Sequence, residues 1–365
     1  MAVNSLREKG RTAVYELEGP RSSLSIHPFT RDAAQRWDEF VMAQPGGSPF
    51  HLSAWKVCLE KTFGYESCYF YAKRDGEITA IAPVFYISNW IVGRCLLSTP
   101  FAVYGGICAA DAESEKALLE HLRSLGVSQQ ADYLELRYRE RDPLEGFSPV
   151  SRYVTFTKEL LPDPEANLKR LPKDTRYMIR KSIKAGLRAE RGFDQLDVFY
   201  KLFACSMKRL GTPVFPEALF ENLIEEFAGI TDLTIIYSGN QAVAGVFSFF
   251  FRDAILPYYA GASEEANSLA ANNFMYWDLM KYAIEKGVRQ FDFGRSKKGT
   301  GAYDFKSQWA MNEKPLNYQM QLIRRKEVPN FSPLNPKFQL ATRMWNRLPL
   351  RLTTWLGPRV VRWFP

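Results

Sequence analysis

The sequence contains few of the residues that metal centres and covalent catalysts require. Its 365 residues include only five cysteines and three histidines. The cysteines are odd in number and show no Cys-x-x-Cys spacing, which argues against a disulfide framework and a structural zinc site. The histidines (His27, His51 and His121) stand singly, and no Gly-x-Ser-x-Gly elbow occurs. We therefore expect no metal, no covalent nucleophile and a reducing compartment.

Long apolar segments are missing as well. Residues 1–19 carry charges throughout and have no apolar core of signal-peptide length. The most apolar stretch, from Ile78 to Val92, is shorter than the roughly 20 residues of a membrane helix and is interrupted by Pro83. The expectation is a cytoplasmic protein that does not cross a membrane.

The charges are unbalanced, with 48 Lys and Arg against 40 Asp and Glu and a net charge of +8. Such an excess suits an anionic partner, for example nucleic acid, a phosphorylated substrate or a lipid surface. A solvated basic surface explains it equally well. Charge alone therefore does not identify a partner.

The chain is longer than the roughly 250–300 residues at which one hydrophobic core stops growing, so two units are expected. Each half shows helical and strand patterns in a similar order, ending in a helix and a strand. This order predicts an α/β (α+β) protein made of two related units, with two unrelated α/β domains as the alternative. The predicted division is an N-terminal extension (1–25), two units (26–160 and 161–325) and a C-terminal tail (326–365).

Between the units, residues 173–186 predict a basic helix. Arg176, Arg180 and Lys184 recur every four residues and form one stripe on its surface. No acidic residue lies between Asp174 and Glu190, so these charges lack local partners. The stripe suits a phosphate or pyrophosphate ligand, and a solvated basic face is the equally weighted alternative.

A second pattern spans residues 291–309. A strand containing Asp292 ends in a glycine-rich basic loop with Arg295 and Lys298, which leads into a short helix that carries Lys306. Backbone amides and basic side chains can hold an anion at such a place. A plain turn explains the glycines alone.

The segment Tyr303-x-Phe305-Lys306-x-x-Trp309 resembles the signature near the end of Fem-type transferases. The helix reading Arg-x-x-x-Arg-Lys-x-x-Lys-x-Gly resembles the basic motif of the same family. The pieces 100–106, 259–262 and 272–273 are similar to FemAB-like proteins of the exosortase (PEP-CTERM) and exopolysaccharide group. This resemblance covers roughly residues 26–325. It implies two tandem acetyltransferase-like (GNAT) domains with mixed sheets flanked by helices.

The resemblance also implies an activity, the transfer of an acyl group, aminoacyl in the best-known members, to an amine on an envelope precursor. Lys306 matches the family lysine that stabilises the developing oxyanion, a role in which a fixed cation is most effective. Asp292 and Tyr303 are candidates for the general base. The predicted substrate-binding residues are Tyr104, Arg176, Arg180, Lys184, Tyr259, Asn273, Arg295 and Lys298.

The sequence departs from the CoA-binding pattern. CoA enzymes carry a glycine-rich loop before the helix that holds the pyrophosphate, whereas residues 261–273 have two acids and lack those glycines. No heptad pattern predicts the inserted arm of many tRNA-using members, which leaves tRNA use open. We expect no cofactor, with aminoacyl-tRNA or an acyl thioester as co-substrate. The alternatives are an acyl-CoA- or acyl-carrier-dependent N-acyltransferase on an amino sugar, and a non-catalytic scaffold of exopolysaccharide assembly.

The tail combines basic and aromatic residues. No acidic residue occurs from Val328 to the end. Arginines and tryptophans alternate there in the manner of segments that settle at a headgroup boundary. The expectation is a peripheral contact with the anionic inner face of the plasma membrane, near a phosphate-bearing or lipid-linked precursor; packing on the protein itself is the alternative. The residues concerned are Lys337, Arg343, Arg347, Arg351, Arg359, Arg362, Trp345, Trp355 and Trp363.

Overall fold

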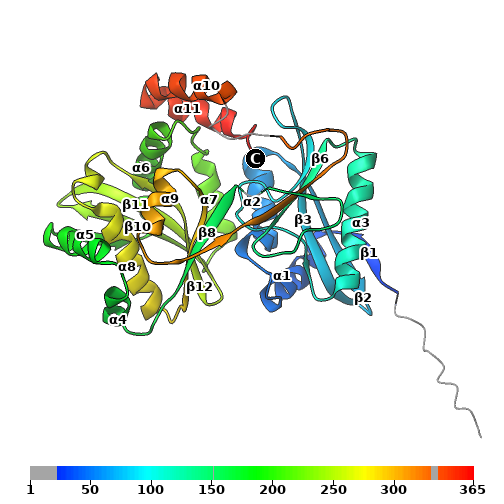
Figure 1. Cartoon of the computed structure of the whole chain (residues 1–365), viewed down its shortest axis with the longest axis horizontal. Helices are drawn as coiled ribbons and strands as arrows, with labels where there is room; N and C mark the ends of the chain where they lie inside the picture. Colours follow the sequence, from blue (N-terminus) through cyan, green and yellow to red (C-terminus); the bar gives the residue numbers. More distant parts are fainter. Residues whose placement is uncertain (1–22, 151, 330–335) are drawn as a thin grey trace, which may run out of the picture.

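The structure is a computed structural model that describes residues 23–150, 152–329 and 336–365, without the side chains of 336–341. Most of the predicted N-terminal extension and the Lys337 side chain lie outside these residues. Within them the strands form one eight-stranded and one seven-stranded sheet, each flanked by helices (Figure 1).

The first unit is built on the eight-stranded sheet, in the order β1-β2-β3-β4-β6-β15-β7, with β5 pairing β3. Its strands are antiparallel neighbours except for β4 and β6, which run parallel. The elements are β1 (Ser25–Pro28), α1 (Ala34–Ala43), α2 (Ser53–Phe63), β2 (Glu66–Arg74), β3 (Glu77–Asn89), β4 (Gly93–Ser98), β5 (Cys108–Ala109), α3 (Ala112–Ser128), β6 (Tyr133–Tyr138) and β7 (Ser148–Pro149).

The second unit is built on the seven-stranded sheet, in the order β14-β8-β13-β12-β11-β10-β9. Two C-terminal helices follow it. The elements are β8 (Tyr153–Glu159), α4 (Pro164–Lys169), α5 (Lys173–Lys184), β9 (Leu187–Arg191), α6 (Leu196–Arg209), α7 (Glu217–Glu226), β10 (Thr231–Ser238), β11 (Gln241–Phe251), β12 (Ala254–Ala262), α8 (Ala271–Glu285), β13 (Gln290–Lys297), α9 (Gly301–Ser307), β14 (Asn312–Pro315), β15 (Asn317–Leu322), α10 (Pro336–Arg347) and α11 (Leu350–Val361).

The two units repeat one order of elements. Each runs strand, two helices, three antiparallel strands, a long helix and a strand, from β1 to β6 and from β9 to β13. In each, the strand after the long helix pairs in parallel with the third of the three antiparallel strands, β6 with β4 and β13 with β12; in the first unit the short strand β5 lies between β4 and the helix. The repeat that the sequence predicts is therefore present in the structure.

Two strands cross between the units. Strand β8 lies before the predicted boundary at residue 160 but pairs with β13 and β14 in the second sheet. The predicted second unit runs to residue 325 and therefore includes β15, yet β15 pairs with β6 in the first sheet. That expectation was wrong because residue alternation identifies a strand and not its partner.

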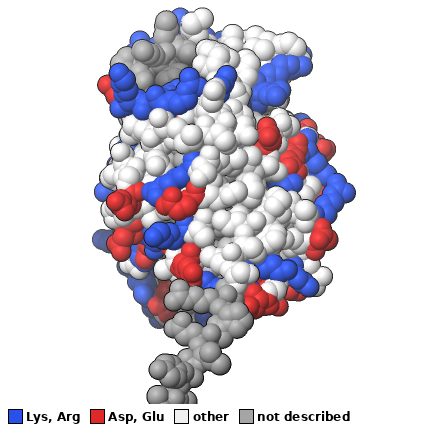
Figure 2. Space-filling view, turned by 90° about the vertical axis from the view of Figure 1, so that its right-hand side faces the viewer, with Lys and Arg blue, Asp and Glu red and all other residues white. Residues whose placement is uncertain are grey.

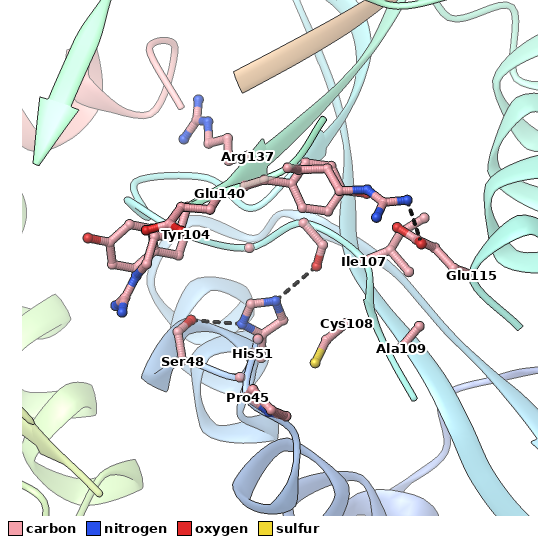
Figure 3. A pocket seen from close by; sticks show the side chains of 17 residues that line it. Pro45, Ser48, His51, Tyr104, Ile107, Cys108, Ala109, Glu115, Arg137 and Glu140 are labelled. Carbon is pink, nitrogen blue, oxygen red and sulfur yellow. Dashed lines mark hydrogen bonds and ion pairs between the residues drawn. The ribbon is translucent and has the colours of Figure 1, made fainter. Parts of the chain in front are cut away.

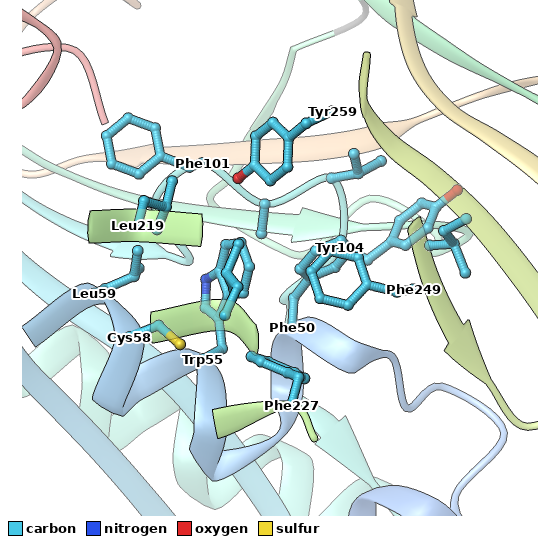
Figure 4. Packing of buried hydrophobic residues seen from close by; sticks show 14 of the residues in the cluster. Phe50, Trp55, Cys58, Leu59, Phe101, Tyr104, Leu219, Phe227, Phe249 and Tyr259 are labelled. Carbon is cyan, nitrogen blue, oxygen red and sulfur yellow. The ribbon is translucent and has the colours of Figure 1, made fainter. Parts of the chain in front are cut away.

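One hydrophobic core spans both units, as Figure 4 shows. Helix α2 packs against α7, and the Sγ atom of Cys58 donates to the carbonyl of Asn222 at 3.3 Å. The ring of Phe50 lies 5.9 Å from that of Phe249 in the second unit. This continuous packing fixes the two units relative to each other and positions the site between them.

The C-terminal helices dock on the second unit over α6 (Figure 1). One face of α11 is buried through Thr353, Gly357 and Val361, and Gly357 fits closely against Val214. The opposite face exposes Leu352 and Trp355. No helix in the described part of the chain is long and apolar enough to span a membrane.

Candidate functional site

The site begins with a bulge in β13. Asp292 pairs with Thr157 and Arg295 with Thr155, so two residues of β13 oppose one residue of β8. Gly294 adopts φ 64°, a left-handed conformation that favours glycine. The bulge interrupts the ladder at Phe293 and makes its carbonyl available to a side chain.

Lys306 occupies this position. Helix α9 starts at the N-cap Thr300 and places Lys306 in its last turn. The Lys306 Nζ atom donates to the carbonyl of Phe293 at 2.6 Å and to that of Arg295 at 3.4 Å. These contacts anchor an ammonium group against β13, near the junction of the two units.

Burial and the neighbouring Arg295 lower the pKa of Lys306 from 10.5 to about 8, although the Asp292 carboxylate opposes this shift. A lysine with this pKa is still largely protonated at neutral pH. It can therefore stabilise a developing negative charge, and it loses that ability in mild alkali.

Asp292 joins the two units. Its carboxylate is 2% exposed and accepts hydrogen bonds from the Tyr104 hydroxyl (2.8 Å), the Thr155 hydroxyl (2.8 Å) and the Gly294 amide (2.8 Å). Arg139 of the first unit adds an ion pair at 3.2 Å and stacks its guanidinium on the Tyr104 ring. With its lone pairs occupied in this way, Asp292 suits a positioning role better than that of a general base.

Arg295 lies among aromatic residues. Its guanidinium is 4.8 Å from the ring centroid of Tyr153 and also interacts with Tyr258 and Tyr318. The Tyr318 hydroxyl donates to the carbonyl of Val103 in the first unit at 2.7 Å. Arg295 thus sits where β13, β15 and the first unit meet, next to Lys306.

A pocket of about 200 Å³ lies in the first unit between β6 and the 45–51 segment (Figure 3). His51 is locked there, with Nδ1 2.7 Å from the Ser48 hydroxyl and Nε2 2.9 Å from the Gly106 carbonyl. Burial lowers the His51 pKa to about 4, so the ring is neutral. Arg141 in this pocket is paired with Glu115 at 2.7 Å. The pocket is therefore largely charge-balanced.

The helix starts that would hold a CoA pyrophosphate are poorly suited to it. At α3 the Asp111 carboxylate caps the helix and accepts from the Ser114 amide at 2.8 Å. The amides of Gly105 and Gly106 both donate to the Arg137 carbonyl at 2.9 Å, so they are not free for a phosphate.

Within the described residues no group of three or more His, Cys, Asp or Glu could hold a metal.

The predicted basic helix, α5, does not bring its charges to Lys306. Its first turn contacts the end of α9, because Thr175 donates to the Gln308 carbonyl at 2.6 Å. Arg176 donates to the carbonyls of Lys169 and Leu171 and thus closes the C-terminus of α4. The side chains of Arg180 and Lys184 are exposed on α5, which lies on the outer flank of the second unit (Figure 1). The structure thus gives Arg176 partners at the end of α4 and leaves Arg180 and Lys184 exposed, and phosphate binding by this stripe stays a prediction.

The remaining predicted residues lie in three different places. Tyr303 and Lys298 both bind the Glu313 carboxylate, each at 2.8 Å. The hydrogen bond to Glu313 raises the pKa of Tyr303, so less of the phenolate that a general base requires is present at neutral pH. Tyr259 is buried in the shared core, with no hydrogen-bond partner for its hydroxyl in the described structure. Asn273 is buried in the first turn of α8.

The sequence analysis missed Arg137, Arg139 and Thr155. Arg139 and Thr155 bind Asp292, and Arg137 pairs with Glu135 at 2.8 Å beside Arg295. The alternation of β6 puts Arg137 and Arg139 on one face of the strand, and that was the available signal. Without knowing which strand lies opposite, this signal does not point to a site.

Comparison with known proteins identifies the fold. Residues 169–307 match the family model described as Acetyltransferase (GNAT) domain. No curated protein matches the sequence. A crystal structure of FemX is 16% identical with a TM-score of 0.64, over 87% of this chain and all of that one.

Two further structures share the arrangement. The C-terminal domain of a proposed lysylphosphatidylglycerol synthetase from Agrobacterium fabrum is 12% identical with a TM-score of 0.54, over 80% of this chain and 91% of that one. A tandem GNAT protein from the clavulanic acid biosynthesis pathway is 10% identical with a TM-score of 0.54, over 84% of this chain and all of that one. At these identities the similarity concerns the fold.

These matches confirm the predicted fold of two tandem acetyltransferase-like units. The match of residues 169–307 to the GNAT domain supports the predicted class of enzyme, an acyltransferase. The donor, the acceptor and the roles of individual residues are not determined by a fold.

Proposed function

We propose that this protein transfers an acyl group, aminoacyl in the first instance, to an amine of a cell-envelope or exopolysaccharide precursor. The observation that carries this proposal is the Lys306 ammonium, which β13 and α9 hold at the junction of the units. The acceptor amine attacks the carbonyl carbon of an activated ester or thioester and forms a C–N bond. The tetrahedral oxyanion then collapses, the C–O or C–S bond breaks, and the amine proton passes to the leaving group through solvent.

Lys306 supports the step in which charge develops. Its ammonium is already desolvated and directed by two carbonyls, so little reorganisation is needed when the oxyanion forms. Asp292 and its partners hold β13, and therefore the carbonyl that positions Lys306. In this scheme Asp292 and Tyr104 are positioning residues. Tyr303 stabilises the first turn of α9 through its hydrogen bond to Glu313.

The proposed donor and acceptor follow from the start of helix α3 and from the proteins that share the fold. Asp111 occupies the helix start at which the first unit would hold a CoA pyrophosphate, which favours an ester of another kind, such as an aminoacyl-tRNA. The fold is shared with FemX and with a proposed lysylphosphatidylglycerol synthetase, an enzyme whose name indicates a lipid product. The motifs around Tyr104 and Tyr259 favour the exopolysaccharide group.

The shared fold with a tandem GNAT protein keeps a CoA-dependent N-acyltransferase on an amino sugar as the second candidate. Calorimetry with acetyl-CoA separates the two, since the proposal predicts no heat of binding. Saturable binding would instead favour the CoA-dependent enzyme.

Mass spectrometry of lipid-linked precursors and exopolysaccharide tests the proposal. Cells that carry the gene should contain an acylated species that is missing from cells without it, and the mass difference identifies the group. Identical spectra would favour a non-catalytic scaffold of exopolysaccharide assembly.

A further inference from the structure

We infer that a second pocket, lined by Arg152 and Arg295, binds the phosphate of an ester with an apolar chain. This arginine pocket has a volume of about 160 Å³ and lies between the first sheet and the C-terminus. It is distinct from the pocket at His51. Its lining residues are Val92, Leu97, Tyr133, Glu135, Arg137, Val150, Arg152, Tyr153, Arg295, Tyr318, Met320, Pro329, Phe364 and Pro365.

The pocket contains uncompensated positive charge. Three arginines line it, and the only acidic residue among its lining residues, Glu135, is paired with Arg137 at 2.8 Å. Arg137 also donates to the carbonyls of Thr99 and Ala102, so its guanidinium is fully engaged. In the part of the chain that the structure describes, neither Arg152 nor Arg295 has a carboxylate within ion-pair distance. Arg152 donates one long hydrogen bond, to the Pro329 carbonyl at 3.4 Å, and Arg295 interacts with Tyr318. A guanidinium has five N–H donors, so both groups keep donors for an anion.

A phosphate fits these groups better than a single carboxylate does. Guanidinium forks bind phosphate oxygens in a bidentate manner, and two of them facing one pocket match two or more oxygens of a phosphate or pyrophosphate. Arg295 is already oriented by the rings of Tyr153 and Tyr318, so it loses little freedom on binding. In contrast, Arg139 and Arg141 of the His51 pocket are both paired with carboxylates.

The walls of the arginine pocket are apolar. Val92, Leu97, Val150 and Met320 line it with Phe364, beside the tyrosine rings. Inorganic phosphate would leave these walls unused, whereas an ester whose carbon chain passes over them would bury apolar surface. The lining therefore favours an amphiphilic phosphate over the free ion.

The location links the pocket to the membrane and to Lys306. At its inner end, the backbone carbonyl of Arg295 accepts from the Lys306 Nζ atom at 3.4 Å. Val92 and Phe364 also line it, and Trp90, two residues before Val92, packs against Trp363, the residue before Phe364, with ring centroids 5.7 Å apart. Trp90 is 79% exposed, as is typical of residues that insert at a headgroup boundary. A lipid-linked phosphate could thus reach the site while its chain stays in the bilayer.

Binding of defined probes tests this inference, which relies on the proposed function only in taking the ligand to be the acceptor. Calorimetry of the full chain would compare farnesyl diphosphate below its aggregation concentration with inorganic pyrophosphate and farnesol. Farnesyl diphosphate should bind most tightly, pyrophosphate more weakly, and farnesol without saturation. Arg152→Gln and Arg295→Gln should each weaken binding by about tenfold or more, because each removes a charge-assisted contact.

Two controls keep the inference separate from folding and from catalysis. Arg36→Gln removes an exposed arginine on α1 and should leave binding unchanged. Lys306→Met should retain binding and lose transfer, so loss of transfer alone does not affect the pocket. Saturable binding that is unaltered in Arg152→Gln, or no binding of either phosphate, would overturn the inference. Tighter binding of pyrophosphate than of farnesyl diphosphate would indicate a free anion and reject the lipid source.

Discussion

At the scale of single residues, Lys306 links the fold to the chemistry. Its pKa of about 8 means that the ammonium required for oxyanion stabilisation is lost in mild alkali. We predict that transfer activity falls as the pH rises through about 8, by about tenfold per unit beyond that point. In Lys306→Arg this decline should disappear, because arginine stays charged. A pH profile of initial rates checks both; an alkaline decline that persists in Lys306→Arg would assign it to another group.

The same pKa predicts a pH-dependent stability. The folded pKa of about 8 lies below the ordinary value of 10.5, so between these values the unfolded state binds more protons than the folded state. The free energy of unfolding of the natural protein relative to Lys306→Met should therefore be level below pH 8 and rise between pH 8 and 10.5. Urea unfolding of both proteins at about pH 7 and about pH 9.5 measures this difference. A difference that does not change with pH would contradict the burial of the ammonium.

The sequence predicted single residues unevenly. Lys306 and Arg295 were singled out because the glycine-rich loop and the short helix that follows it are local features that resemble the Fem-type signature, and their roles stay predictions. Phosphate binding was predicted for Arg180 and Lys184 because a basic stripe without local acids suggests an anionic ligand. In the structure both side chains are exposed to solvent. Apart from the Gly294 amide, the hydrogen-bond donors to Asp292 come from residues that are 137 to 188 positions away in the chain, which no local pattern encodes.

At the scale of elements, α11 confirms that the tail packs on the protein, and its contact with a membrane stays a prediction. One face packs on the protein through Thr353, Gly357 and Val361, while the other exposes Leu352 and Trp355. The exposed arginines Arg351, Arg359 and Arg362 lie on this helix or just after it, and Figure 2 shows basic side chains gathered at the upper end of the molecule. This combination suits the surface of an anionic bilayer.

We predict that the exposed face, and not the whole tail, provides membrane contact. The double substitution Leu352→Ser with Trp355→Ser should reduce flotation with anionic vesicles several-fold without unfolding the protein, since neither side chain is buried. Val127→Ser is the matched control, because Val127 is 66% exposed on α3 in the first unit. Equal flotation of all three proteins, or flotation with neutral vesicles only, would count against the membrane face.

Strands illustrate the limit of local patterns. The predicted strand containing Asp292 is present as β13, but the partner of a strand depends on contacts between distant residues. The exchange of β8 and β15 between the sheets could therefore not be read from the sequence. It matters for the site, because β15 brings Tyr318 beside Arg295.

At the scale of the whole molecule, the shared core predicts joint unfolding. Contacts between Phe50 and Phe249 and between Trp55 and Phe227 cross the junction, as do the hydrogen bonds of Asp292. Calorimetry should show one transition, with equal calorimetric and van't Hoff enthalpies. Asp292→Asn should lower its midpoint, because Arg139 loses the carboxylate with which it pairs. Two separate transitions would show that the units fold independently.

The central claim is that Lys306 catalyses acyl transfer to an envelope amine, and complementation tests it most directly. Cells that lack the gene would receive the natural protein, Lys306→Met or Arg36→Gln at equal levels, and their precursors and exopolysaccharide would be analysed by mass spectrometry. The account predicts that the acylated species returns with the natural protein and with Arg36→Gln, and falls by about a hundredfold or more with Lys306→Met. Full restoration by Lys306→Met would contradict it.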